Sequence, residues 1–259
     1  MASKKSRKIA VANEKGGVGK TATIVNLGAA LSLEGYQVLI VDMDPQFNAT
    51  QGLGISADDI AHSVYDLING EEALSPADAV LPTRWKGLAC LPSVPDLAGA
   101  EVELVNVEGR ENRLRQGLAG LDGGYDYILL DTPPSLSLLT VNVFAYAGEV
   151  LVPCQTQPYA FNALNELFDT IGAIRRGINT KLKTTGVVAT FHDQRTRVSN
   201  HTLERLKSDK RYGPLLFETV IRSNITVAES AHVGKPVVFY RPGSYGARDY
   251  MRLAEELAG

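Results

Sequence analysis

Lys15-Gly16-Gly17-Val18-Gly19-Lys20-Thr21 decides the fold class of this 259-residue chain. The stretch follows an apolar run at residues 9–12 and comes directly before a helical pattern. Glycines let backbone N–H groups curl around a polyphosphate, and the N-terminus of the following helix adds partial positive charge. The placement therefore predicts a phosphate-binding loop, and a glycine-rich turn that binds nothing is the alternative. The expected nucleotide contacts are Lys15, Gly16, Gly17, Val18, Gly19, Lys20, Thr21 and Ala22.

The loop fits the general pattern G-x-x-x-x-G-K-[ST] only in its second half. Lys20 would reach the β- and γ-phosphates and the Thr21 hydroxyl would ligate Mg²⁺. Glu14, however, stands where the first glycine of the pattern belongs. Lys15 is a second lysine, which an ordinary loop of this kind does not need, so its role decides how the loop works.

With Lys15 in place, the loop resembles the deviant Walker A loop, K-G-G-x-G-K-[ST], of the ParA/MinD group of P-loop ATPases. The resemblance covers roughly residues 8–257 and is closest to ParA/Soj proteins. It implies that Lys15 crosses a dimer interface to the nucleotide of the partner. An ATP-dependent sandwich dimer, with catalytic roles for Lys15 and Lys20, is therefore expected.

Carboxylates follow two of the predicted buried strands. Asp42 and Asp44 come after residues 38–41, and Asp131 comes after residues 127–130. Open α/β sheets bind ligands at the carboxyl ends of their strands, so these carboxylates should lie beside the loop. One can act near the metal and another near the attacking water. The alternative is that they cap helices or face solvent in a turn.

The resemblance assigns roles to these carboxylates. The family carries D-x-D-P-Q-G-N and D-[TC]-P-P at these places, and this chain departs from it with Phe47 in place of the glycine. Asp44 is then expected to position the attacking water. Thr21, Asp42 and Asp131 are expected to hold Mg²⁺ and its waters. Phe47 could alter closure of the following loop and hence the hydrolysis rate.

Alternating apolar runs and helical patterns indicate an α/β chain with a mostly parallel sheet and helices on both faces, the P-loop NTPase fold. Residues 71–95 are expected to be an irregular surface excursion, and residues 1–7 a flexible start to one domain spanning residues 1–259. Strands are predicted at residues 9–13, 38–41, 127–130, 149–152, 185–189 and 215–221. Helices are predicted at residues 21–34, 58–69, 96–106, 110–121, 136–147, 160–177, 197–208 and 244–257.

Composition narrows the class of protein. The chain is 44% hydrophobic and 21% charged, which suits one large α/β domain. Neither a signal peptide nor an apolar run of membrane-spanning length is recognisable, so a cytoplasmic location is expected. Cys90 and Cys154 lack metal-ligand spacing and are expected to be buried, unreactive apolar residues.

Charge is distributed unevenly along the chain. Residues 1–171 carry a net charge of −10 and residues 172–259 a net charge of +7. A basic C-terminal third could present a patch to nucleic acid, or it could be a solvated surface that balances the acidic part.

A DNA surface is also implied by the family resemblance. Residues 190–196 are similar to a T-x-x-D-x-R-T stretch, in which Arg195 takes the place of a DNA-binding arginine. A later basic motif is only partly matched, because Ser223 and Thr226 occupy its two basic positions and Arg222 replaces its proline. The cations expected to form a nonspecific DNA surface are Arg195, Arg197, Arg222, Lys235 and Arg241, with Arg248 nearby. The alternative is that these side chains form surface ion pairs.

The resemblance implies a partitioning ATPase that coats nonspecific DNA as an ATP dimer and is released by a ParB-like partner. Two alternatives stay open: an ATPase that positions another cargo through an adaptor protein, and a nucleotide-dependent switch with negligible turnover. A MinD-type membrane ATPase is disfavoured because residues 250–259 end acidic rather than basic. An iron–sulfur relative of the nitrogenase iron protein is disfavoured by the positions of Cys90 and Cys154.

Overall fold

The computed structural model describes residues 6–70, 74–121 and 123–259. An eight-stranded sheet runs through this part of the chain in the order β3-β4-β2-β5-β1-β6-β7-β8, and only β3 is antiparallel to its neighbour. The strands are β1 (Arg7–Val11), β2 (Val38–Val41), β3 (Leu81–Pro82), β4 (Leu88–Leu91), β5 (Tyr127–Asp131), β6 (Glu149–Gln155), β7 (Lys183–His192) and β8 (Leu216–Arg222). The predicted mostly parallel α/β sheet is confirmed.

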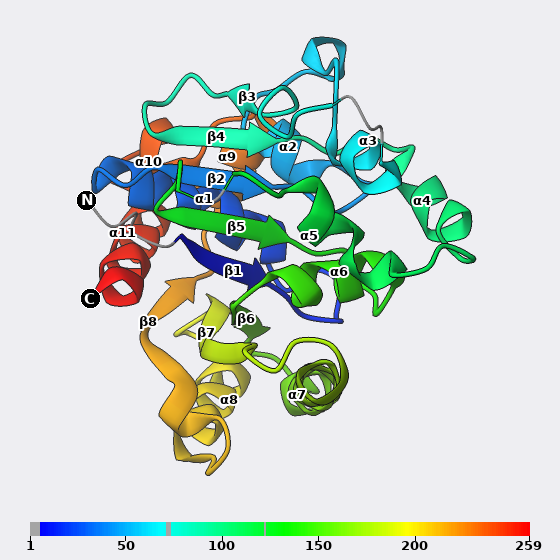
Figure 1. Ribbon diagram of the computed structural model, residues 1–259. Helices are drawn as coiled ribbons and strands as arrows, with labels where there is room; N and C mark the ends of the chain where they lie inside the picture. Colours follow the sequence, from blue (N-terminus) through cyan, green and yellow to red (C-terminus); the bar gives the residue numbers. More distant parts are fainter. Residues whose placement is uncertain (1–5, 71–73, 122) are drawn as a thin grey trace.

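Helices cover both faces of the sheet (Figure 1). One face packs against α1 (Lys20–Leu33), α2 (Asn48–Gly52), α9 (Ile225–His232), α10 (Val237–Tyr240) and α11 (Tyr245–Ala258). The other packs against α3 (Val64–Asn69), α4 (Leu97–Glu103), α5 (Arg113–Gly117), α6 (Leu138–Tyr146), α7 (Ala160–Gly177) and α8 (Arg197–Ser208). Short 3-10 turns occur at η1 (Ala57–Asp59), η2 (Arg110–Asn112) and η3 (Gly213–Leu215).

The two cores follow from the alternation of side chains along a strand. In β1, Ile9 and Val11 belong to the core beneath α1, whereas Ala10 belongs to the core beneath α6 and α7. Every residue of β2 is fully buried, as expected of a strand covered on both faces. The continuous apolar runs in the sequence therefore reflect burial on two sides.

The structure corrects several predicted elements. The segment expected to be irregular contains β3 and β4, and β4 pairs in parallel with β2. Prolines on both sides of Leu88–Leu91 conceal this four-residue strand in the sequence. The helix predicted at residues 58–69 is shorter and begins at Val64, and the one predicted at 110–121 reduces to η2 and α5. The short helices α2, α9 and α10 were not predicted.

The N-terminal segment is held in place from Ser6 onward. The Ser6 hydroxyl donates a hydrogen bond of 2.6 Å to the Tyr125 carbonyl, and Arg7 begins β1. Of the residues expected to be flexible, Ser6 and Arg7 make these contacts, and residues 1–5 lie outside the described part of the chain.

The sheet order brings the predicted functional segments together. The carboxyl ends of the parallel strands point to the same side (Figure 1). Along that edge, β2 leads into Asp42, β5 ends at Asp131, β1 leads into the glycine-rich loop and β7 ends at His192. Segments more than a hundred residues apart in the chain thus end on neighbouring strands.

Candidate functional site

The glycine-rich loop has the backbone that anion binding requires. Gly17 and Gly19 adopt φ angles of 73° and 90°, which side chains with a Cβ rarely tolerate. Gly19 is also the N-cap of α1, and no side chain in the described part of the chain caps the first turn of this helix. The N–H groups at the start of α1 are therefore available to a phosphate.

Lys20 lies inside this loop rather than in solvent. It is 7% exposed, and its ammonium donates to the Lys15 carbonyl over 3.4 Å. Burial lowers the pKa of Lys20, and the carboxylates of Asp131 and Asp44 partly oppose that effect. A phosphate oxygen would be a stronger acceptor than this carbonyl, so the ammonium is placed to bind one.

Thr21 and Asp131 meet at the position expected for a metal. The Thr21 hydroxyl donates to Asp131 Oδ2 over 2.9 Å, across two segments 110 residues apart. Burial raises the pKa of Asp131 well above its usual range, and the nearby charges of Asp42 and Asp44 add to the effect. A divalent cation would offset the repulsion among these carboxylates.

The residues present fit Mg²⁺ better than a metal that needs an all-protein cage. The described residues include no group of three or more His, Cys, Asp or Glu side chains arranged to hold an ion. Mg²⁺ commonly takes one or two protein oxygens and completes its shell with water and substrate phosphates. Thr21 with Asp131 supplies that kind of partial shell.

Asp42 is more enclosed than its predicted role suggested. It is fully buried and accepts hydrogen bonds from Thr50 N, Thr50 Oγ1 and Asp44 N at 2.9, 2.8 and 3.2 Å. Burial raises the pKa of Asp42 to about 6, against the lowering effect of these bonds. Because its oxygens already have these donors, Asp42 is better placed to orient a metal-bound water than to ligate the ion directly.

Asp44 begins a tight turn at the same edge of the sheet. Its Oδ1 accepts from Gln46 N over 3.0 Å, and its carbonyl accepts from Phe47 N over 2.8 Å. Phe47 then adopts φ 43° as the N-cap of α2. The carboxylate of Asp44 is therefore held near Lys20 by local backbone geometry.

A cavity of about 270 Å³ lies beside the start of α1. Thr21 and Ala22 line it together with Lys235, one of the cations predicted to contact DNA. The other lining residues come chiefly from α1, α2 and α9: Val25, Asn26, Asn48, Gln51, Gly52, Ser230, Ala231 and Pro236. Sequence reasoning missed the lining residues on α2 and α9 because it did not predict these two helices.

Two of the predicted DNA-binding arginines are paired with carboxylates. Arg195 makes two bonds of 2.9 Å to Asp193, and this pairing lowers the pKa of Asp193 to about 2. Arg222 contacts both oxygens of Asp249. The alternative of surface ion pairs thus holds in part, because the charge of each arginine is locally balanced. Arg197 and Arg241 are exposed, at the start of α8 and after α10.

The cysteines lie where the sequence suggested. Both are buried, and burial raises the pKa of Cys154 to about 12 against the opposing charge of Lys15. That opposing effect also places Lys15 near the end of β6. In the described part of the chain the Lys15 ammonium has neither an ion pair nor a hydrogen bond to a side chain, and it stays available to a ligand.

Comparison with known proteins agrees with this geometry. Residues 6–184 match the family described as "AAA domain". The chain is 42% identical to the sporulation initiation inhibitor protein Soj of Bacillus subtilis, covering 96% of this chain and 97% of Soj. It is 40% identical to the chromosome partitioning protein ParA of Myxococcus xanthus, covering 97% of this chain and 87% of that protein.

This chain belongs to the ParA/Soj family of P-loop ATPases. A solved structure of cobyrinic acid a,c-diamide synthase from Mycobacterium smegmatis, with bound ADP and magnesium, is also similar. It superimposes with a TM-score of 0.83 at 34% identity and covers 96% of this chain and 93% of its own. The bound ADP and magnesium of that protein are consistent with the ATP and Mg²⁺ expected for this site.

The positions of the two cysteines give no structural support to an iron–sulfur relative of the nitrogenase iron protein. Neither cysteine is placed on the surface, as a cluster shared between subunits would require. No helix among the described residues has the length and apolar character needed to cross a membrane. For a ParA/Soj-type ATPase, the departures that matter are Phe47 near the carboxylates and Arg222, Ser223 and Thr226 in the later basic motif.

Proposed function

We propose that this protein is a Mg²⁺-dependent ATPase that forms an ATP-dependent sandwich dimer, binds DNA nonspecifically and segregates a chromosome or plasmid with a ParB-like partner. The observation that carries the ATPase assignment is the contact of Thr21 with Asp131 beside a buried Lys20. These residues come from two segments far apart in the chain, the start of α1 and the end of β5, and together they form part of a phosphate and metal site.

The chemistry rests on positioning and charge. Mg²⁺, when bound, supplies positive charge that offsets the charge of the phosphates. Lys20 would neutralise phosphate oxygens from inside the loop, while Thr21 and Asp131 would hold the metal and Asp42 would orient its water. Asp44 holds the attacking water. Phosphoryl transfer needs little more from a protein than this alignment and electrostatic stabilisation.

Lys15 connects catalysis to dimerisation. Its ammonium has no salt bridge in the described chain, and it belongs to the same loop as Lys20, which lies near the carboxylates of Asp131 and Asp44. In an ATP-bound dimer, Lys15 of the partner subunit would neutralise phosphate charge, much as an arginine finger does. Hydrolysis is then weak in the isolated protein and stimulated by the partner protein and DNA.

DNA binding is the part of the proposal with the narrowest support. Phosphate contacts need clustered cations, and Arg197 and Arg241 are exposed while Arg195 and Arg222 are paired. DNA phosphates can replace a surface carboxylate as the partner of Arg195, because exposed ion pairs are worth little. The proposed location is the cytoplasm, in association with the nucleoid.

The deciding experiment measures DNA binding with ATP, with ADP and without nucleotide across a salt series. We expect binding at low salt only with ATP, and Arg197→Ala should reduce the salt slope by about one phosphate contact. Arg176→Ala, at the exposed end of α7, is the matched control and should leave the slope unchanged. Absence of ATP-dependent binding at low salt would rule out the proposed DNA binding.

A second candidate keeps the ATPase and replaces DNA by another cargo held through an adaptor protein. The neutralised Arg195 and Arg222, with Ser223 and Thr226 at usually basic positions, favour it. Neighbouring genes that encode a ParB-like protein beside a centromere-like repeat would count against it. A third candidate, a binding switch with negligible turnover, is eliminated if partner and DNA together stimulate substantial ATP hydrolysis.

A further inference from the structure

The end of β7 touches the nucleotide loop with two consecutive residues. The Thr190 hydroxyl donates to the Val18 carbonyl over 2.8 Å, and both groups are buried. The Phe191 ring packs against Gly19 so closely that a Cβ there would lie 3.1 Å from it. Phe191 also adopts φ 49°, an uncommon conformation for an aromatic residue. A movement of the loop at Val18 or Gly19 would therefore displace Thr190 or Phe191 at the end of β7.

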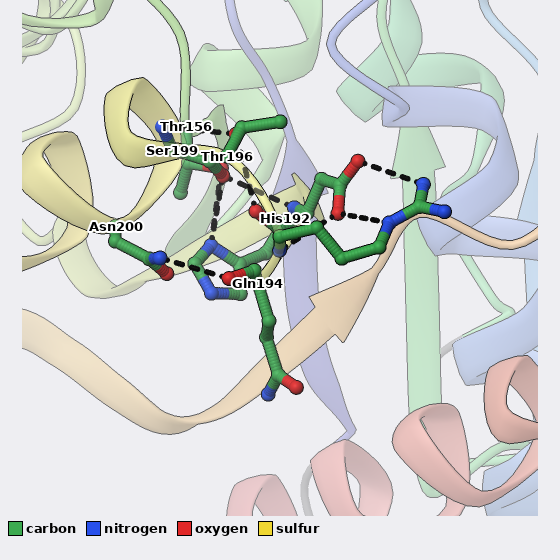
Figure 2. A network of polar contacts seen from close by, with 8 residues as sticks. Thr156, His192, Gln194, Thr196, Ser199 and Asn200 are labelled. Carbon is green, nitrogen blue, oxygen red and sulfur yellow. Dashed lines mark hydrogen bonds and ion pairs between the residues drawn. The ribbon is translucent and has the colours of Figure 1, made fainter.

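The next two residues of the same strand end contact α8 instead. His192 Nδ1 lies 2.9 Å from Ser199 Oγ, and the Asp193 N–H donates to that same oxygen over 3.1 Å. Figure 2 shows His192 directed toward Ser199 and Thr156. Thr156, at the end of β6, lies 2.6 Å from Ser199 Oγ. Ser199 thus forms hydrogen bonds with Thr156, which follows β6, with His192 of β7 and with Asp193 of the β7–α8 turn.

In one arrangement of the protons, every hydrogen bond of this cluster has both a donor and an acceptor. A hydroxyl has one proton to donate, and Ser199 already accepts from Asp193 N–H. If Thr156 donates to Ser199, then Ser199 donates to His192 Nδ1, which must be an unprotonated acceptor. Burial lowers the pKa of His192, in agreement with a neutral ring. Each bond in the buried chain depends on its neighbour, which makes the cluster stiff.

The same cluster positions the turn that carries the exposed arginines. The Thr196 hydroxyl donates to the Asp193 carbonyl and accepts from Ser199 N–H. Asn200 donates to the Gln194 carbonyl over 2.9 Å. Figure 2 shows these side chains surrounding the turn between β7 and α8. Arg195 lies in this turn and Arg197 begins α8.

We propose that His192 and Ser199 are positioning residues, which couple occupancy of the phosphate loop to the placement of the turn at residues 193–197. The biological role of this coupling rests on the proposed function, because the turn carries two of the cations that are proposed to bind DNA. The coupling itself needs only the contacts of Thr190 and Phe191 on one side and Ser199 on the other.

Hydrogen exchange measured by mass spectrometry tests the coupling without DNA. In the unaltered protein, ATP with Mg²⁺ should slow exchange in residues 193–200 by about fivefold or more, the lower end of usual coupling strengths. In Ser199→Ala and in His192→Leu, the nucleotide should still bind, but this slowing should fall to less than twofold. An affinity for ATP within about threefold of the original would show that the loop itself is intact.

Two further variants separate coupling from simple destabilisation. His192→Asn keeps a polar atom near the place of Nδ1 and should retain most of the slowing. Ser208→Ala removes an exposed hydroxyl at the other end of α8, which bonds only to the Arg205 carbonyl among the described residues, and should behave like the original. If His192→Leu does not fold, the slowing of exchange measured in Ser199→Ala tests the coupling by itself.

Two results would overturn the inference: no nucleotide-dependent slowing in the unaltered protein, or the same slowing in Ser199→Ala. DNA affinity measured in parallel tests the proposed function separately. A protein that shows the slowing but never binds DNA would retain the coupling and lose the DNA assignment. If the protein binds DNA with ATP, but the slowing of exchange is the same in Ser199→Ala, the DNA assignment stands and the coupling is ruled out.

Discussion

Phe47 shows how a single residue can strain the site it supports. Its φ of 43° places a side chain with a Cβ in the left-handed region, where it begins α2 beside Asp44. Such a conformation costs roughly 1–2 kcal/mol for a residue other than glycine. It persists because bonds from Phe47 N to Asp44 O and from Gln51 N to Phe47 O hold the turn.

Comparing two substitutions at position 47 isolates this strain. Phe47→Gly and Phe47→Ala both remove the ring, but only alanine retains the Cβ that disfavours φ 43°. We expect the glycine variant to be more stable than the alanine variant by about 1 kcal/mol, measured by urea unfolding. Equal stability, or a more stable alanine variant, would show that the turn relaxes to another conformation.

Substitution of the two lysines of the loop should affect ATP binding and ATP hydrolysis differently. Lys20 is buried beside the phosphate position, so Lys20→Ala should weaken ATP binding by about 10–100-fold, the usual worth of a charge-assisted hydrogen bond. Lys15→Ala should leave ATP binding largely intact but remove the stimulation of hydrolysis by partner and DNA. Nucleotide titrations and steady-state hydrolysis assays separate the two. Stimulation that survives in Lys15→Ala would rule out its role across the dimer.

Among the elements, the outer strand β8 and helix α11 depend on one another. The Glu256 carboxylate of α11 accepts from the N–H groups of Glu218 and Thr219 at 2.7 and 2.9 Å. Asp249 of the same helix accepts from Arg222 N–H over 3.0 Å. These carboxylates occupy donors that an edge strand would otherwise offer to another chain.

Removal of one such carboxylate should expose the edge. Glu256→Ala should lower the free energy of unfolding by about 1–3 kcal/mol, because two N–H groups lose a charged acceptor. It should also increase self-association, detected by light scattering over a range of concentrations. The control is Glu255→Ala, since the exposed Glu255 side chain accepts no hydrogen bond in the described part of the chain. If both variants behave alike, edge capping does not explain the contact.

At the scale of the whole molecule, the unliganded site lowers the stability of the fold. Asp42, Asp44 and Asp131 are all at least nine-tenths buried, and Lys20 is the nearby cation. Burying carboxylates together costs free energy, which a bound cation and nucleotide recover. The stability of the fold and the binding of ATP with Mg²⁺ should therefore be strongly linked.

Asp131→Asn should separate fold stability from ligand binding. The neutral amide keeps the shape of the side chain and removes the repulsion from Asp42, so the unliganded melting temperature should be equal or higher. ATP with Mg²⁺ at about 100 times its dissociation constant should stabilise the original protein by about 2.7 kcal/mol. Most of that gain should vanish in the variant, and likewise in the original protein when EDTA is added. A variant that keeps the full gain would exclude Asp131 from the metal site.

The long, regular elements of this fold were predictable because their patterns are local. The helices α7 and α8 and the strand-loop-helix around Lys20 lie where periodicity and glycine placement indicate. The short β4 and the five-residue α2 were not predictable, because their stability comes from packing and pairing rather than from their own residues. The cavity beside Thr21 escaped prediction for the same reason.

The sequence by itself determined the chemistry of this protein: an anion-binding loop, two lysines and the carboxylates at strand ends, since these depend on residue type and on spacing within one element. Only the tertiary structure decided how they are paired. It placed Asp131 on Thr21 and Asp249 on Arg222. Such pairings depend on strand order and helix packing, which bring together segments that are far apart in the chain.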